Sequence, residues 1–152
     1  MRIVAGTARG VVLKTPSGME TRPTSDRLKE ALFSIIHFDI PGANVLDLFG
    51  GTGQLGIEAL SRGAKRAVFV DQSSTACKLI KENLQRAGFA DRAVVQCCDY
   101  TAYLRSSKEK FDLILLDPPY AEVFLENSLK MITEIDILQS GGKEYDIVFF
   151  LM

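Results

Sequence analysis

The stretch Val45-Leu46-Asp47-Leu48-Phe49-Gly50-Gly51-Thr52-Gly53 decides the fold of this chain. Its apolar half, Val45–Phe49, is typical of a buried strand, and the glycines that follow indicate a tight loop. A helical pattern over about residues 54–62 comes next and ends at Gly63. A strand, a glycine loop and a helix in this order predict the start of a βαβ unit.

The rest of the chain repeats this alternation. Strands are expected at residues 67–70, 93–98, 111–116 and 145–151, and helices at about 74–87 and 122–133. Ser73 or Ser74 is expected to cap the helix over 74–87, and Gly88 to end it. Strands that alternate with helices predict an α/β fold, with a mostly parallel sheet covered by helices on both faces.

Two elements are expected ahead of this core. Residues 2–5 and 11–14 predict a small β-hairpin, and Thr24-Ser25-Asp26 predicts the cap of a helix that runs to about Phe38. The apolar spacing of that helix predicts that one face is buried, with the residues Leu28, Ala31, Leu32, Ile35 and Ile36. The whole chain, 1–152, is expected to form a single domain, with 1–20 as the hairpin extension and 21–152 as the core.

Composition narrows the class of protein. The 152 residues carry a net charge of −1, which by itself does not indicate nucleic-acid binding. Residues 1–30, however, hold six Lys/Arg against three Asp/Glu, so this basic head could contact phosphates. Three cysteines without a CxxC pattern predict reduced, mostly buried thiols and no metal site. No apolar segment resembles a signal or a membrane span, so we expect a cytoplasmic protein.

An acidic residue closes each of four predicted strands. These residues are Asp47, Asp71, Asp99 and Asp117. Ligands of such sheets bind beyond the carboxyl ends of the strands, so the four carboxylates are expected to line one crevice. A crevice of this charge attracts a cation.

The glycine loop contains a literal G-x-G-x-x-G at Gly51, Gly53 and Gly56, with Asp71 20 residues after Gly51. This spacing is also that of dinucleotide-binding enzymes, in which the acid binds ribose hydroxyls. Asp47, directly ahead of the loop, would repel the pyrophosphate of a dinucleotide. S-adenosylmethionine has no phosphate and carries a cationic sulfonium and ammonium, so the charges favour it. A dinucleotide oxidoreductase stays open as an alternative.

The motif Asp117-Pro118-Pro119-Tyr120 favours methyl transfer to an amino group. The lone pair of an exocyclic amino group is delocalised into its base, so the nitrogen is a poor nucleophile. The Asp117 carboxylate and the Pro118 carbonyl can accept hydrogen bonds from its N–H groups and direct the lone pair toward a methyl donor. The ring of Tyr120 can stack on the base.

These motifs together resemble the class I, Rossmann-like methyltransferases that modify amino groups. The opening Met1-Arg2-Ile3-Val4-Ala5-Gly6-Thr7-Ala8-Arg9-Gly10 and the later Thr21-Arg22-Pro23-Thr24-Ser25-Asp26-Arg27-Leu28-Lys29-Glu30 more specifically resemble the RsmD family. The resemblance covers residues 1 to about 122. It implies a bacterial enzyme that uses S-adenosylmethionine to methylate the N2 amino group of a guanine in small-subunit (16S) ribosomal RNA. The implied partner is that RNA or a partly assembled small ribosomal subunit.

The resemblance also implies roles for single residues. The catalytic group that holds the target guanine consists of Asp117, Pro118, Pro119 and Tyr120. The cofactor is held by Asp47, Phe49, Gly50, Gly51, Thr52, Gly53, Asp71, Gln72, Cys98 and Asp99. Candidates for contact with the RNA are Arg9, Lys14, Arg22 and Thr24. Gly50 departs from the family, which usually has alanine there, and we expect this change to be harmless.

The end of the chain departs further. The family continues past the strand near residue 150 with a helix and a closing hairpin, so the closing strands are expected to be missing here. An uncovered last strand predicts self-association through a hydrophobic sheet edge. Two further alternatives stay open beside the oxidoreductase. The shared Asp-Pro-Pro-Tyr chemistry leaves a DNA adenine-N6 methyltransferase open, and the short C-terminus leaves an RNA-binding form without full catalytic activity open.

Overall fold

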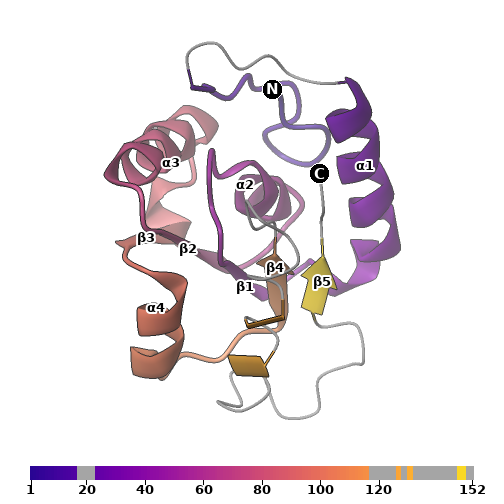
Figure 1. Cartoon of the computed structure of the whole chain (residues 1–152). Helices are drawn as coiled ribbons and strands as arrows, with labels where there is room; N and C mark the ends of the chain where they lie inside the picture. Colours follow the sequence, from indigo (N-terminus) through magenta and orange to yellow (C-terminus); the bar gives the residue numbers. More distant parts are fainter. Residues whose placement is uncertain (17–22, 117–125, 128–129, 132–146, 150–152) are drawn as a thin grey trace.

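The computed structural model describes the chain apart from residues 17–22, 117–125, 128–129, 132–146 and 150–152 (Figure 1). Its strands are β1 (Asn44–Asp47), β2 (Arg66–Asp71), β3 (Ala93–Cys97), β4 (Leu113–Leu116) and β5 (Ile147–Phe149). Its helices are α1 (Pro23–Ile35), α2 (Gln54–Ser61), α3 (Ser74–Ala87) and α4 (Tyr100–Ser106), with the 3-10 turns η1 (His37–Asp39) and η2 (Ala90–Arg92).

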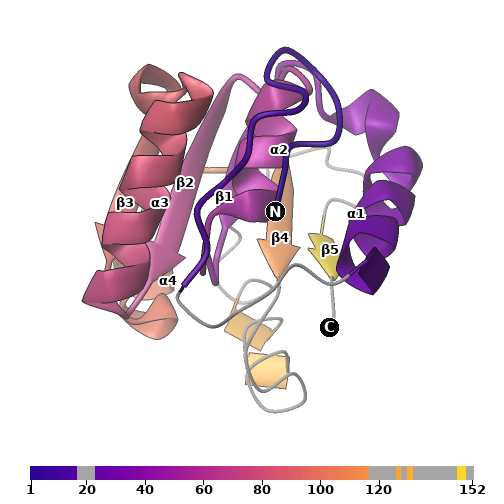
Figure 2. The same cartoon turned by 90° about the horizontal axis from the view of Figure 1, so that it is seen from above.

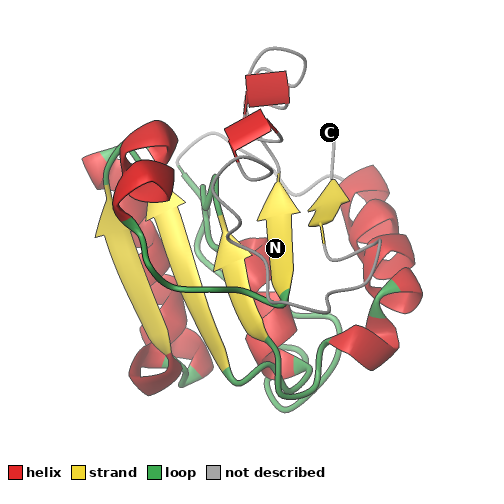
Figure 3. Cartoon of the chain, turned by 90° about the horizontal axis from the view of Figure 1, so that it is seen from below, coloured by secondary structure: helices red, strands yellow, loops and turns green. Residues whose placement is uncertain are grey.

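The five strands form one parallel sheet in the order β3-β2-β1-β4-β5. Figure 3 shows their arrowheads on the same side of the molecule. From β1 the chain first builds outward to β2 and β3, and then returns to the other side of β1 with β4. The carboxyl ends of β1 and β4 therefore flank the point where the strand order reverses, which is where such folds bind ligands.

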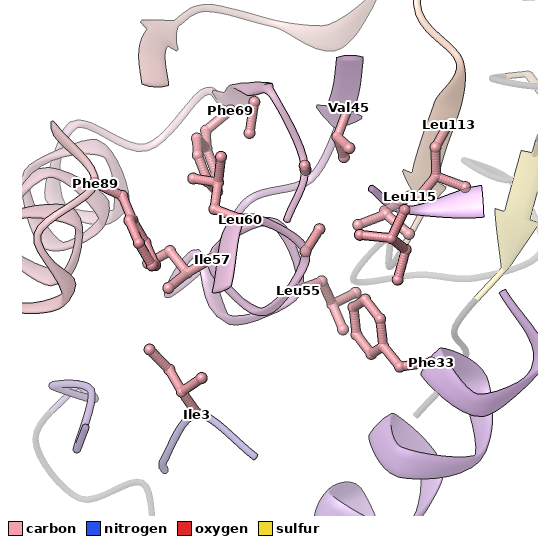
Figure 4. Close-up of a cluster of buried hydrophobic side chains, with 14 of the residues drawn as sticks. Ile3, Phe33, Val45, Leu55, Ile57, Leu60, Phe69, Phe89, Leu113 and Leu115 are labelled. Atoms are coloured by element: carbon pink, nitrogen blue, oxygen red, sulfur yellow. The ribbon is translucent and has the colours of Figure 1, made fainter. Parts of the chain in front are cut away.

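Alternate residues of the strands face two different cores. Val45, Phe69 and Leu115 point into a larger cluster shared with α1, α2 and α3, part of which Figure 4 shows. Leu46 and Val70, from the same strands, point into a smaller cluster with α4. Helices thus cover both faces of the sheet, as the sequence predicted.

The residues 1–14 form an antiparallel pairing rather than two full strands. The bridge joins Arg2 and Val12, and the Ile3 amide donates to the Val11 carbonyl over 2.9 Å. Figure 2 shows this indigo segment running over α2, between α3 and α1. Because Ile3 and Leu13 are buried in the larger cluster, the segment forms a further layer outside the helices.

The expected bounds hold for some helices and not for others. Ser73 caps α3 through its hydroxyl, which accepts from the Ala76 amide, and Gly88 closes that helix at φ 82°. Helix α1 already begins at Pro23, whose fixed φ suits a first helical position, and it ends at Ile35. The expected helix at 122–133 falls mostly outside the described residues. Helix α4 was not predicted.

The buried face of α1 differs from the predicted one. Leu28 and Ile35 are 42% and 76% exposed, whereas Leu32, Phe33 and Ile36 are buried. The face is rotated because the charged Lys29 belongs to it, only 1% exposed. An apolar pattern could not include that residue, since its burial depends on an acid elsewhere in the chain.

Cysteine burial differs as well. Cys77 is buried and Cys98 half-buried, but Cys97 is exposed at the edge of the sheet. No helix within the described ranges is long and apolar enough to cross a bilayer.

Candidate functional site

The glycine loop leaves β1 at Asp47 and enters α2 at Gln54. Its turn is closed by the Gly53 amide, which donates to the Gly50 carbonyl over 2.7 Å. Gly51 and Gly53 have φ values of 58° and 83°, which favour glycine. A Cβ at Gly51 would meet no atom within 4 Å, so this part of the loop presents bare backbone to open space.

The third glycine of the motif has a packing role. A Cβ at Gly56 would lie 2.3 Å from the ring of Phe69 on β2, so α2 approaches the sheet more closely than any side chain allows. The Gly56 amide donates to Oδ2 of Asp47 over 3.0 Å, and Asp47 is only 1% exposed. Asp47 thereby accepts from the first turn of α2, where the amide ends of the helix dipole stabilise a carboxylate.

Asp71, at the end of β2, contacts the glycine loop directly. Its Oδ2 accepts from the Gly51 amide over 3.0 Å, and its Oδ1 accepts from the Ser73 amide over 2.9 Å. Each carboxylate oxygen can accept a second hydrogen bond. The carboxylate therefore lies beside the exposed backbone of the loop, where it can also accept from hydroxyls of a ligand.

The end of β3 lies next to Asp71 at the end of β2. The Cys98 amide donates to the Asp71 carbonyl over 3.1 Å, and burial, followed by the charge of Asp99, raises the pKa of the Cys98 thiol. Asp99 caps α4 and accepts from both the amide and the hydroxyl of Thr101. The ring of Tyr100 on α4 lies 5.1 Å from that of Phe49 in the loop.

The structure thus brings the carboxyl ends of β1, β2 and β3 to the same side of the sheet, where Asp47, Asp71 and Asp99 lie. Gln72 follows Asp71 and is exposed; its carbonyl lies 3.9 Å from the Cys97 sulfur. Asp117 to Tyr120 and Arg22 lie outside the described residues. Thr24 lies on α1, and its side chain is not described.

A pocket of about 610 Å³ opens beside the loop. One wall is the N-terminal segment, another is the loop with the start of α2, and the third is α3 as far as Glu82. The lining residues are Met1, Lys14, Thr15, Pro16, Asp47, Phe49, Gly50, Gly51, Thr52, Gln54, Leu55, Ser73, Thr75, Ala76, Lys78, Leu79 and Glu82. Asp71, Cys98 and Asp99, at the ends of β2 and β3, do not line this pocket. The pocket therefore lies on the side of the loop that faces α3.

The two RNA candidates of the N-terminal segment lie at opposite ends of α2. Lys14 lines the pocket, and its Nζ is 3.2 Å from a carboxylate oxygen of Glu82. Arg9 belongs to the tip of the segment, which is bound to the other end of the helix: the Thr7 amide donates to the Ser61 carbonyl over 2.8 Å. An eight-residue helix is about 12 Å long, so the two ends of the segment are held at well-separated points of α2.

Sequence reasoning missed two buried polar residues that bind the N-terminal segment, Asn83 and Glu58. Asn83 is 0% exposed and bonds to the backbone of both Lys14 and Thr52. Glu58, also 0% exposed, accepts from the Val4 and Ala5 amides. A polar residue at a helical position otherwise occupied by apolar ones was the available signal for both.

The glycine loop and its neighbours fit the chemistry of S-adenosylmethionine. Bare backbone at Gly51 allows close approach, the neighbouring carboxylates suit a cation, and Asp71 has acceptor capacity for ribose hydroxyls. These features also fit a dinucleotide in part, but Asp47 lines the pocket next to the loop and would face its phosphates.

Comparisons with known proteins identify the family of the chain. The family model described as "Conserved hypothetical protein 95" matches residues 1–149. YlbH of Bacillus subtilis (strain 168) is 39% identical over 145 residues, which are 93% of this chain and 79% of that protein. Ribosomal RNA small subunit methyltransferase D of Haemophilus influenzae is 34% identical over 148 residues, 95% of this chain and 77% of that protein.

The fold has a solved counterpart of similar extent. The structure of a hypothetical protein from Thermus thermophilus superimposes with a TM-score of 0.81 at 33% identity, and covers 99% of this chain and 84% of that one. With the family model spanning nearly all of the sequence, and with relatives above 30% identity, the chain belongs to the RsmD family of class I, S-adenosylmethionine-dependent methyltransferases.

Proposed function

We propose that this chain transfers a methyl group from S-adenosylmethionine to the N2 amino group of a guanine in small-subunit ribosomal RNA. The observation that carries the cofactor part of this proposal is the hydrogen bond from the Gly51 amide to Asp71, which joins the glycine loop to the acidic end of β2. Membership of the RsmD family and the name of the Haemophilus influenzae relative support the RNA substrate.

The residues of the loop and of the strand ends would hold the cofactor. Asp71 would accept from its ribose hydroxyls, Asp47 and the backbone of Phe49 to Gly53 would hold its methionine part, and Asp99, with Cys98 and Gln72 beside it, would contact the adenine. When bound, the cofactor supplies an electrophilic methyl group on a cationic sulfur, whose departure as a neutral thioether drives the transfer.

We assign the base to the Asp-Pro-Pro-Tyr motif that follows β4 in the sequence. Asp117 and the carbonyl of Pro118 would accept hydrogen bonds from the amino group, and Tyr120 would stack on the ring. Methyl transfer would form the new N–C bond at the expense of the C–S bond of the cofactor, and the amino nitrogen would release one proton to solvent. The guanine has to be unpaired or flipped out, since a stacked amino group cannot reach such a motif. Arg9, Lys14, Arg22 and Thr24 are proposed contacts to the RNA.

Cofactor binding is tested by titrating the chain with S-adenosylmethionine in a calorimeter, beside an Asp71→Ala variant. Loss of a charged acceptor should weaken binding about 10- to 100-fold. Asp91→Ala is the matched control, because Asp91 is exposed in η2, and its affinity should equal that of the parent chain. No binding of S-adenosylmethionine by the folded parent chain would contradict the proposal.

The substrate is tested with a radiolabelled methyl donor on naked 16S RNA and on isolated small subunits, followed by nucleoside analysis. N2-methylguanosine is the expected product, and its absence from both substrates, despite cofactor binding, would favour an RNA-binding form without catalytic activity. N6-methyladenosine formed on DNA would establish the other alternative. Faster methylation of one of these two substrates would show whether the enzyme acts on naked RNA or on the assembled particle. Light scattering of the purified chain tests the separate prediction that it self-associates through the last strand.

A further inference from the structure

Asn83 occupies a position in α3 that should be apolar. The buried residues of this helix are Cys77, Ile80, Asn83 and Leu84, and the Asn83 side chain is 0% exposed. An asparagine in a helix interior is less favourable than leucine or alanine, and a buried amide costs further free energy unless its hydrogen bonds are made. Its presence in the core therefore calls for specific partners.

All three described bonds of this amide go to backbone atoms far away in the sequence. Oδ1 accepts from the Lys14 amide over 2.7 Å. Nδ2 donates to the Lys14 carbonyl over 3.0 Å and to the Thr52 carbonyl over 2.9 Å. One short side chain with two N–H donors and one acceptor is a carboxamide, and asparagine is the residue that supplies it at this length.

These partners belong to two walls of the same pocket. Lys14 to Pro16 form the wall from the N-terminal segment, and Phe49 to Thr52 form the wall from the glycine loop. Thr52 stands between Gly51 and Gly53, which both have positive φ. The Asp71 carboxylate fixes the amide of Gly51, and Asn83 fixes the carbonyl one residue later.

We infer that Asn83 is a positioning residue, which sets the glycine loop for the cofactor and holds the N-terminal segment in register with it. It acts through the Thr52 carbonyl and the Lys14 backbone and does not itself contact the cofactor. The inference rests on the proposed binding of S-adenosylmethionine by this loop. It assigns to a core residue of α3 an effect on cofactor affinity that a purely stabilising residue would not have.

The test is an Asn83→Asp variant, which keeps the shape and the acceptor for Lys14 but places a carboxylate oxygen against two carbonyls. At a temperature well below its Tm, where the chain stays folded, its dissociation constant for S-adenosylmethionine should rise about tenfold. Gln85→Glu is the matched control, because the same chemical change falls on an exposed position of the same helix. Its affinity should equal that of the parent chain.

Measuring the dissociation constant of Asn83→Asp as a function of pH adds a quantity that would not change if Asn83 only stabilised the fold. Burial raises the pKa of a carboxyl group, so the new acid becomes neutral as the pH falls and regains one O–H donor. The tenfold deficit of Asn83→Asp relative to the parent chain should therefore shrink between pH 8 and pH 5. If Asn83→Asp does not fold, Asn83→Ala, which adds no charge, takes its place, and the expected loss of affinity is the same.

Unchanged affinity in a folded Asn83→Asp or Asn83→Ala variant, with only the Tm lowered, would overturn the inference, because Asn83 would then merely stabilise the core. Equal weakening by Gln85→Glu would overturn it too, since the effect would not depend on the buried bonds. A parent chain that does not bind S-adenosylmethionine overturns the proposed function first, and with it this inference, so the two failures are distinguishable.

Discussion

At the scale of single residues, the two glycines Gly50 and Gly56 have different reasons to lack a side chain. A Cβ at Gly56 would lie 2.3 Å and 2.6 Å from atoms of the buried Phe69 ring, and a ring cannot bend out of the way. A Cβ at Gly50 would meet the Cδ1 end of Ile80 at 2.7 Å, and that flexible end can turn away. This contrast predicts that the loop tolerates an alanine at position 50 but not at position 56.

Gly56→Ala should therefore destabilise the chain by about 1–3 kcal/mol, because helix α2 has to move off the sheet. Gly50→Ala is the matched control, and its free energy of unfolding should change by less than about 1 kcal/mol, since overpacking against Ile80 is offset by a less flexible unfolded chain. Urea unfolding followed by circular dichroism measures both. Equal destabilisation of the two variants would contradict this account of the loop.

At the scale of elements, a buried ionic cluster joins α1, α2 and the N-terminal segment. Glu58 of α2 is 3.3 Å from Nζ of Lys29 on α1, and Nε of Arg62 donates to it over 2.9 Å. Lys29 also donates to the Arg2 carbonyl over 3.0 Å, while the Val4 amide donates to Glu58 over 2.9 Å. Charges and amides of three elements thus satisfy one buried carboxylate.

Lys29→Met should cost about 3 kcal/mol of stability, because it removes one charge of a buried pair and leaves the other without its compensation. Lys14→Met breaks the exposed pair with Glu82, whose side chains are 55% and 40% exposed, and should cost less than about 1 kcal/mol. The denaturant midpoints of the two variants give the comparison, provided that their m-values are equal. A Lys29→Met variant as stable as Lys14→Met would show that Arg62 and the Val4 and Ala5 amides compensate Glu58 without Lys29.

At the scale of the whole molecule, the N-terminal segment belongs to the same core as the sheet. Ile3 and Leu13 are 1% and 2% exposed, and they pack in the cluster that holds Ile57 and Leu60 of α2. Figure 4 shows Ile3 facing Ile57 and Phe89 across this cluster. Since the segment also lines the pocket through Lys14, its docking bears on the site as well as on stability.

Ile3→Ala should lower the free energy of unfolding by about 2–5 kcal/mol in a single transition, as for any core isoleucine. Val12→Ala, at a position 53% exposed on the same segment, should change it by less than about 0.5 kcal/mol. Fluorescence and circular dichroism should report coincident transitions for both variants. A separate early transition for Ile3→Ala would mean that the segment unfolds independently of the sheet.

Much of this architecture could be predicted from local patterns. Apolar runs, glycine positions and helix caps predicted β1 to β4, α2 and α3 within a few residues, because each pattern lies within one element. Helix α4 was missed because its seven residues, Tyr100–Ser106, are too short for a clear apolar period. The buried face of α1 was assigned wrongly because it includes a lysine.

The sequence by itself determined that carboxylates gather at the carboxyl ends of the parallel strands. Each acid follows a strand, and parallel strands bring their carboxyl ends to the same side whatever their order. Only the tertiary structure decided which polar residues are buried and why. Asn83 and Lys14 are 69 positions apart, and Glu58 and Val4 are 54 apart. A buried polar group is stable only beside its partner, and chain folding alone brings such distant partners together.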